Sequence, residues 1–354
     1  MRPLAIDPAR LCYRALIGTG GIGWGMFFAL NGNHTLGREE SRSGRLLDRK
    51  DYCKLHIISH YVCTLMCPGF HTLPIGMVGG DDAGRRLQAE MGEAGLDLRY
   101  VRTDPERPTL FSICLLYPDG SGGNLTVNDS ASSQVTPEMI RAAEADLAAN
   151  AQEGIALAVP EVPLAARAEL LELATRYRLL RAASFTTEEI PIALESGLLA
   201  QVDLLALNID EAARLAGSRP RSGTGELPAI EIVRAVFQRL RQIQPAMWVT
   251  VTAGSRGSWS WDGRELSHCP AHKVAVASTA GAGDAHFAGV LVGVAAGLPL
   301  AQAHELGSLV AALSVTSYHT INKEIDRDSL RVLAEQLPSP VSAGVAALLD
   351  AGRS

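Results

Sequence analysis

Short apolar runs and helically spaced apolar positions follow one another in regular succession along most of this chain. From residue 137 onward the pattern predicts strands at 155–159, 180–183, 204–207 and 247–252, and helices at 137–149, 165–177, 190–199 and 211–216. Strands that alternate with helices form a doubly wound, mostly parallel sheet with helices on both faces. The pattern therefore predicts an α/β fold.

The first third of the chain follows the same pattern with one departure. Strands are predicted at 13–17 and 73–78, and helices at 52–66 and 83–94. Two further strands, at 109–117 and 124–127, flank a Gly-rich turn and predict a small β hairpin outside the main alternation. The segment 31–50 is polar, charged and rich in turn and cap residues.

Length, charge and cysteine usage narrow the class of protein. A chain of 354 residues with 47% hydrophobic content can fill the core of one large α/β domain. The net charge of −6 argues against a nucleic-acid or anionic-membrane partner, and no apolar run reaches the length of a bilayer span. The six scattered cysteines lack the spacing of a disulfide framework, which favours the cytoplasm.

The run 278–289 carries the most specific chemical signal. The small residues Gly281, Ala282 and Gly283 stand directly before Asp284, and a helical apolar pattern follows to Leu298. Backbone N–H groups at such a helix start attract an anion, and small residues let a phosphate approach closely. A carboxylate beside this site suits a general base that removes a proton from the attacking group. A Gly-rich turn with Asp284 as helix cap is the alternative.

Two more strand ends carry candidate ligands. Asn208 and Glu211 follow the strand 204–207 and either order a metal–phosphate shell through water or form an N-cap with an acid in the first turn. The segment 249–257 leads from a strand into a Gly-bearing turn, which either lies against a nucleotide or is an ordinary β-turn. Ligands bind at the carboxyl ends of strands in such sheets, so we expect these segments to meet in one cleft.

These motifs, in this order, resemble those of the ribokinase-like carbohydrate kinases, the PfkB family. The resemblance rests on Asn208 with Glu211, on the stretches 251–257 and 281–284, and on a Gly-x-Val-Gly-x-Asp-x-x-Gly element at 76–84. It covers roughly residues 12–337 and implies a single ribokinase-like α/β domain with a small β lid. Parts of about 18–50 and 105–130 are expected to form the lid, and 338–354 a C-terminal tail segment.

The resemblance implies ATP-dependent phosphorylation of a hydroxyl on a small sugar, nucleoside or related polyol. Asp284 then takes the proton from the alcohol, and the amides of residues 281–283 stabilise the transferring phosphoryl group. Asn208 and Glu211 position Mg²⁺, Glu211 through water. The residues implied to line the nucleotide are Thr252, Gly254, Gly257 and Ser308. The open edge of the lid implies a homodimer.

The acceptor-binding elements of the family are altered here. The Asp expected after the first strand is absent from 18–25, and a gapless count back from Gly84 places the Gly-Gly-x-x-x-Asn element on 55–60. His60 then occupies the Asn position. We therefore predict three acceptor-binding residues: His60, Gly20 in the Gly-rich loop, and Asn33 in the polar segment that follows.

Three other interpretations stay open. A non-catalytic relative that binds a nucleotide or a sugar is compatible with the altered acceptor elements. The run 18–23, with Glu39 or Glu40 further on, matches a dinucleotide fingerprint and suggests an NAD-dependent oxidoreductase. On one predicted helical face, four residues have side chains that can bind zinc: His56, His60, Cys63 and Cys67.

Overall fold

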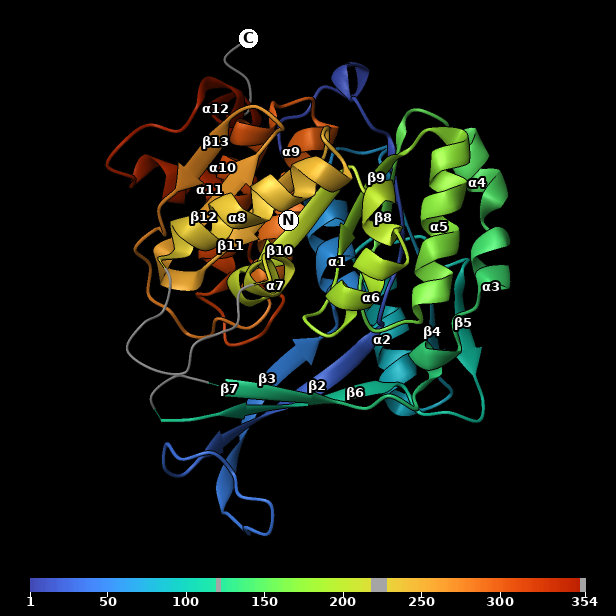
Figure 1. Ribbon diagram of the computed structural model, residues 1–354, viewed down its shortest axis with the longest axis vertical. Coiled ribbons are helices and arrows are strands. Elements are labelled where there is room, and N and C mark those ends of the chain that lie inside the picture. The colour runs from blue at the N-terminus through green and yellow to red at the C-terminus, as the bar shows by residue number, and fades with distance from the viewer. Residues whose placement is uncertain (119–121, 218–227, 351–354) are drawn as a thin grey trace.

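A nine-stranded sheet forms the centre of the molecule (Figure 1). The computed structural model describes residues 1–118, 122–217 and 228–350. The strand order is β13-β12-β11-β10-β9-β8-β1-β4-β5, parallel from β11 to β5 and antiparallel at the β12 and β13 edge. The strands are β1 (Ala15–Thr19), β4 (His71–Gly79), β5 (Val101–Asp104), β8 (Gly154–Ala158), β9 (Leu180–Ser184), β10 (Leu204–Asn208), β11 (Trp248–Thr252), β12 (Ser258–Trp261) and β13 (Leu266–Cys269).

The two faces of this sheet bury two separate cores. Successive strand residues point to opposite sides, so that Leu16 belongs to one core and Ile17 to the other. One face is covered by α1 (Lys54–Leu65), α2 (Asp82–Glu93), α9 (Ala282–Ala295), α10 (Leu300–Ser314), α11 (Arg327–Glu335) and α12 (Ala343–Leu349). The other carries α3 (Pro137–Arg141), α4 (Glu144–Ala149), α5 (Leu164–Tyr177), α6 (Glu189–Glu195), α7 (Ile209–Leu215) and α8 (Ala229–Ile243). This arrangement confirms the predicted doubly wound α/β fold.

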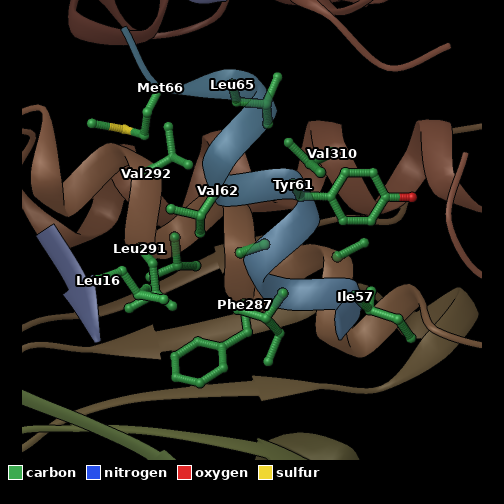
Figure 2. Close-up of a cluster of buried hydrophobic side chains, with 14 of the residues drawn as sticks. Leu16, Ile57, Tyr61, Val62, Leu65, Met66, Phe287, Leu291, Val292 and Val310 are labelled. Atoms are coloured by element: carbon green, nitrogen blue, oxygen red, sulfur yellow. The ribbon is translucent and has the colours of Figure 1, made fainter. Parts of the chain in front are cut away.

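Helix α9 is enclosed on all sides, and every residue from Ala285 to Ala295 is buried. Helix α1 packs along it, and Figure 2 shows Val62 of α1 close to Leu291 and Val292 of α9. A helix without a solvent-facing side is held by its neighbours over its whole length. The N-terminus of α9, which carries the Gly281–Asp284 motif, therefore has a fixed position.

A second, four-stranded sheet lies apart from the main sheet (Figure 1). It consists of β2 (Gly23–Leu30), β3 (Gly44–Tyr52), β6 (Leu110–Leu116) and β7 (Gly122–Thr126), in the order β3-β2-β6-β7. The antiparallel β6–β7 pair confirms the predicted hairpin, although residues 119–121 of its turn lie outside the described residues. The hydrophobic pattern did not predict the individual strands β2 and β3, which lie in the region where the resemblance implies part of the lid. Strand β3 lies at an edge of this sheet and carries several charged residues in its sequence. Charges on an edge strand discourage pairing with strands of other molecules.

The ends of the chain pack on the main domain as well. Leu4 and Ile6 are buried near the start, and Val345, Leu348 and Leu349 of α12 belong to the same core as α1 and α9. The division of the chain at residues 12 and 337 stays a prediction, as does a dimer through the four-stranded sheet. The last four residues of the predicted tail segment lie outside the described residues. None of the helices in the described ranges has the length and apolar character that a membrane crossing needs.

Candidate active site

A cavity of about 700 Å³ opens at the carboxyl ends of β10 and β11, beside the N-terminus of α9. The residues predicted to bind the nucleotide and its metal and those predicted to be catalytic all line it. They are Asn208, Glu211, Thr252, Gly254, Gly257, Gly281, Ala282, Gly283, Asp284 and Ser308. The sheet topology brings these residues together because β10 and β11 are parallel neighbours and end at the same edge.

The Gly281–Asp284 motif forms the start of α9. Gly281 is the N-cap with φ +76°, and a Cβ there would come within 3.0 Å of the Thr320 carbonyl oxygen. Only glycine adopts this conformation without strain. At Gly283 the nearest atom to such a Cβ is the Thr252 Oγ1, 3.7 Å away, so the backbone is open to a ligand. Asp284 lies in the first turn, and among the described residues no side chain caps the helix. The Ala282 N–H donates to the Thr279 carbonyl oxygen at 3.3 Å, and the helix start leaves its other first N–H groups available for an anion.

Lys54 forms an ion pair with the Asp284 carboxylate, and both side chains line the cavity. Its Nζ lies 3.2 Å from Asp284 Oδ1, and the two side chains are 29% and 16% exposed. The carboxylate of Asp284 raises the pKa of the Lys54 ammonium, against the opposing effect of burial, and Glu211 and Glu161 add to the rise. Lys54 therefore stays charged and partly neutralises the negative charge at this end of the cavity.

Glu161 is a second carboxyl group that lies close to Lys54. It follows β8 with φ +78°, an uncommon conformation for a residue with a side chain. Its Oε2 accepts a hydrogen bond from the Lys54 backbone N–H at 3.2 Å. Burial raises the pKa of Glu161 to about 7, and Lys54 limits the rise. A Cβ on Gly21 would lie 2.4 Å from Glu161 Oε2. The glycine at this position therefore makes room for the Glu161 carboxylate.

Asn208 and Glu211 form a complete capping box at the start of α7. The Asn208 Oδ1 accepts from the Glu211 N–H at 2.8 Å, and Glu211 Oε2 accepts from the Asn208 N–H at 2.8 Å. Both residues also line the cavity, and burial raises the pKa of Glu211 while Lys54 opposes the rise. The two interpretations of this pair are therefore compatible, since a cap that fixes Glu211 also aims its carboxyl group at the cavity wall.

The turn after β11 depends on two glycines with positive φ. Gly254 has φ +56° and no atom within 4 Å of a Cβ position, whereas Gly257 has φ +83° and would place a Cβ 2.2 Å from the Cys269 carbonyl oxygen. This turn brings the backbone of 253–257 to the cavity.

The three predicted acceptor-binding residues do not line this cavity within the described residues. His60 is 2% exposed in the core, and Gly20 would clash with Val159 Cγ2 at 2.3 Å if it carried a Cβ. Asn33 lies exposed between β2 and β3. His60 lies six residues after Lys54 on α1, more than one turn further along and on another side of the helix, so the two side chains do not face the same cavity. A role of His60, Gly20 or Asn33 toward the acceptor stays a prediction.

Lys54 and Glu161 were not predicted, although each has a recognisable signal. Lys54 is the single Lys, Arg, Asp or Glu within the apolar stretch 52–66, and Glu161 stands between Pro160 and Val162 directly after a buried strand. A lone charge at the end of an apolar run marks a position where burial has to be compensated.

Two of the alternative interpretations lose their structural basis. The Gly-rich run 18–23 leads into β2, so it lacks the helix N-terminus that a dinucleotide pyrophosphate needs. No group of three or more His, Cys, Asp or Glu side chains suited to a metal occurs in the part of the chain that the structure describes. His56 and His60 are buried in the core instead.

Comparison with known proteins supports the ribokinase-like fold. Ribokinase from Giardia lamblia superimposes with a TM-score of 0.75 at 16% identity, over 90% of this chain and 99% of that one. Arabidopsis thaliana ribokinase, solved in complex with ribose and ATP, gives a TM-score of 0.67 at 19% identity, over 91% and 98%. At these identities the likeness shows the fold alone.

Two curated relatives match shorter stretches. The uncharacterized sugar kinase YegV of Escherichia coli (strain K12) is 34% identical over 124 residues, or 35% of this chain and 36% of the relative. Fructoselysine 6-kinase of Shigella flexneri is 42% identical over 71 residues, or 20% and 27%. The chain thus spans about a third of the length of these relatives.

The family match is longer and contains most of the cavity. It runs over residues 68–327 and corresponds to the pfkB family carbohydrate kinases. The capping box of α7, the glycine turn after β11 and the start of α9 all fall within it. On this evidence the chain belongs to the pfkB family of carbohydrate kinases.

Proposed function

We propose that this protein is an ATP-dependent kinase that phosphorylates a hydroxyl group of a small sugar, nucleoside or related polyol. One observation carries the proposal. Asp284 stands in the first turn of α9 at the wall of a cavity, beside the backbone amides of a helix start that no side chain of the described residues caps, and 3.2 Å from the Lys54 ammonium. A base, an anion site and a cation in one place are what phosphoryl transfer to an alcohol requires.

The residues fit a nucleoside triphosphate with its metal. The open position at Gly283 lets a phosphate reach the backbone, and the start of α9 favours its negative charge. Asn208 and Glu211 supply the oxygen atoms that Mg²⁺ prefers and would hold it, Glu211 through water. A Mg²⁺ ion held there would supply positive charge to neutralise the phosphates.

In the reaction the acceptor hydroxyl gives its proton to the Asp284 carboxylate while its oxygen attacks the γ-phosphorus. The bond from that phosphorus to the bridging oxygen breaks, and ADP leaves with the bond's electron pair. Lys54 balances the charge of the transferring group, and the amides of residues 281–283 hold its oxygens.

On the acceptor side we propose Glu161 as a hydrogen-bond partner for acceptor hydroxyls, since it lies beside Lys54 at the end of β8. The four-stranded sheet serves as the lid that excludes water from this region. Water exclusion limits the hydrolysis of ATP without an acceptor.

The experiment measures ADP release from MgATP with a panel of sugars, nucleosides and polyols, and compares the wild-type protein with Asp284→Asn. We expect acceptor-dependent ADP release, with kcat lowered about 10²- to 10⁴-fold in the variant and ATP binding retained. Asp82→Asn, which removes a carboxylate at the exposed start of α2, serves as the control and keeps wild-type turnover.

Unchanged turnover in Asp284→Asn contradicts the assignment of the base. ATP binding without turnover on the whole panel favours the non-catalytic relative. Thermal stabilisation by NAD but not by ATP favours the oxidoreductase, because a ligand that binds the folded state raises its melting temperature.

A further inference from the structure

One face of α10 forms an apolar slot in the cavity with a single polar group. Ser308, Ala311, Ala312 and Val315 stand at helical spacing and all line the cavity, as do Val274 and Val276 from the preceding segment. Among the four α10 positions Ser308 alone has a polar side chain. If the phosphates bind at the start of α9, as the proposed function requires, a flat apolar slot in the same cavity suits the nucleobase.

A chain of buried hydrogen bonds surrounds the Ser308 hydroxyl. Ser258 Oγ lies 2.7 Å from His304 Nε2 and 3.1 Å from Ser308 Oγ, and Ser308 Oγ donates to the His304 carbonyl oxygen at 3.1 Å. Cys269 Sγ lies 3.6 Å from His304 Nδ1. Ser258, His304 and Ser308 are all less than 9% exposed, so this network is shielded from water.

The network fixes what Ser308 offers to a ligand. If His304 carries its proton on Nε2, it donates to Ser258, Ser258 donates to Ser308, and Ser308 donates to the His304 carbonyl. If the proton is on Nδ1, Ser258 donates to Nε2, and Ser308 donates to that same carbonyl or to Ser258. In both tautomers the single hydroxyl hydrogen of Ser308 is engaged and at least one lone pair stays free. Ser308 is therefore an acceptor toward the cavity.

His286 provides an independent sign that the wall of this cavity binds a polar ligand. It lines the cavity and is 2% exposed, and its Nε2 is buried without a hydrogen-bond partner in the described part of the chain. Its ring lies 5.3 Å from that of His304, and burial lowers its pKa to about 4, so it is neutral. A buried polar atom without a partner is uncommon in proteins and is satisfied when a polar group binds nearby.

We infer that Ser308 selects the donor nucleotide by accepting a hydrogen bond from the amino group at position 6 of its purine. Adenine presents an amino group there, whereas guanine and hypoxanthine present a keto oxygen. The keto oxygen would face the Ser308 lone pair without a hydrogen between them. Donation to the ligand would cost the Ser308 hydroxyl its hydrogen bond to the His304 carbonyl oxygen or to Ser258, so the acceptor role is the one that keeps the buried network complete.

The experiment measures the affinity of the folded protein for three nucleotides by titration calorimetry. They are ATP, inosine triphosphate, which has a 6-keto group, and purine riboside triphosphate, which has only hydrogen there. We expect ATP to bind roughly 3- to 10-fold more tightly than the purine analogue, the size of one net hydrogen bond, and inosine triphosphate to bind most weakly. The unaltered protein suffices for this comparison, so it does not depend on how a variant folds.

Ser308→Ala then removes the acceptor. We expect the ATP affinity of this variant to fall roughly 3- to 10-fold and the preference over inosine triphosphate to disappear. Ser314→Ala is the matched control, since Ser314 lies on the same helix, is 2% exposed and donates to the Ala311 carbonyl at 2.8 Å without lining the cavity. It keeps the wild-type ratio of affinities.

Equal binding of ATP and inosine triphosphate by the wild-type protein overturns the role of Ser308 and leaves the proposed function intact. An equal loss of affinity for ATP and for inosine triphosphate in Ser308→Ala also overturns the role of Ser308 and leaves the proposed function intact. Failure of all three nucleotides to bind a folded protein overturns the proposed function and this inference together.

Discussion

A single lysine decides the electrostatics of the candidate active site. The Lys54 ammonium is the group nearest to Asp284, and Glu161 and Glu211 are close enough to shift its pKa. Asp284 and Glu211 both line the cavity, so without Lys54 their two carboxyl groups would face a bound phosphate with no lysine beside them. In the proposed function the transferring phosphoryl group therefore depends on Lys54.

We expect Lys54→Met to lower kcat at least about 100-fold, because the loss of one charge-stabilising group in a shielded site costs about 3 kcal/mol in the transition state. Lys54→Arg keeps the charge and should recover part of the rate. Steady-state kinetics with the best acceptor measure both. Lys50→Met removes an exposed lysine of β3 that pairs with Glu90, and it leaves kcat unchanged. A Lys54→Met enzyme with wild-type kcat would show that the ion pair has a structural role only.

At the scale of an element, the turn between β11 and β12 contains two glycines that are required for different reasons. One is needed for its backbone conformation alone, and the other also because a Cβ would not fit. Gly254 and Gly257 both have positive φ, but only at Gly257 would a Cβ meet backbone, at 2.2 Å from the Cys269 carbonyl oxygen. Gly257 also has ψ −150°, a region that is essentially closed to other residues. We expect Gly257→Ala to lower the free energy of unfolding by at least about 3 kcal/mol, and Gly254→Ala by about 1 kcal/mol. Urea denaturation measures both values, and equal losses would contradict the distinction.

The elements also show what the sequence could reveal. The βα alternation from residue 137 onward was predicted with boundaries mostly within two residues, because buried parallel strands and covering helices have strong periods of their own. Strands β2 and β3 were missed because one contains three glycines or alanines and the other is charged. The cavity residues at strand ends were found through local motifs. Lys54 and Glu161 each stand out locally as a charge beside an apolar run, but their meeting with Asp284 depends on long-range packing, which a local pattern does not encode.

At the scale of the whole molecule, buried histidines set the response to acid. Burial lowers the pKa of His56 to about 3, of His60 and His286 to about 4, and of His304 to about 2. Their unfolded value is 6.5, so each contributes stability above pH 6.5 that is lost as the pH falls toward its folded value. Glu161 has the opposite sign, since its raised pKa adds stability that is lost between pH 4.5 and about 7 as the pH rises. Burial also raises the pKa of Glu211 and of Asp51, which act in the same direction as Glu161.

The four histidines outweigh these three carboxyl groups, so we expect the melting temperature to fall steadily from pH 6.5 to pH 4. For His56 the loss at pH 4 is on the order of 3 kcal/mol. His56→Phe, which removes the titrating group and its unpartnered Nδ1, should flatten this slope. His34→Phe, at an exposed position, should not. Thermal melts in buffers between pH 4 and pH 7.5 measure the slopes, and a flat profile for the wild-type protein would contradict the expectation.

Helices α1 and α9 lie along each other in the core, and each carries one member of the Lys54–Asp284 pair in its first turn. The packing that holds the two helices in register therefore also sets the separation of the proposed base from its cation. A mutation of Val62 or Leu291 touches neither nucleotide nor acceptor in the proposed function. It could still slow turnover by shifting α1 against α9 in a protein that folds. Improved packing along the same contact is a way for selection to tune the rate without touching a residue that meets the substrate.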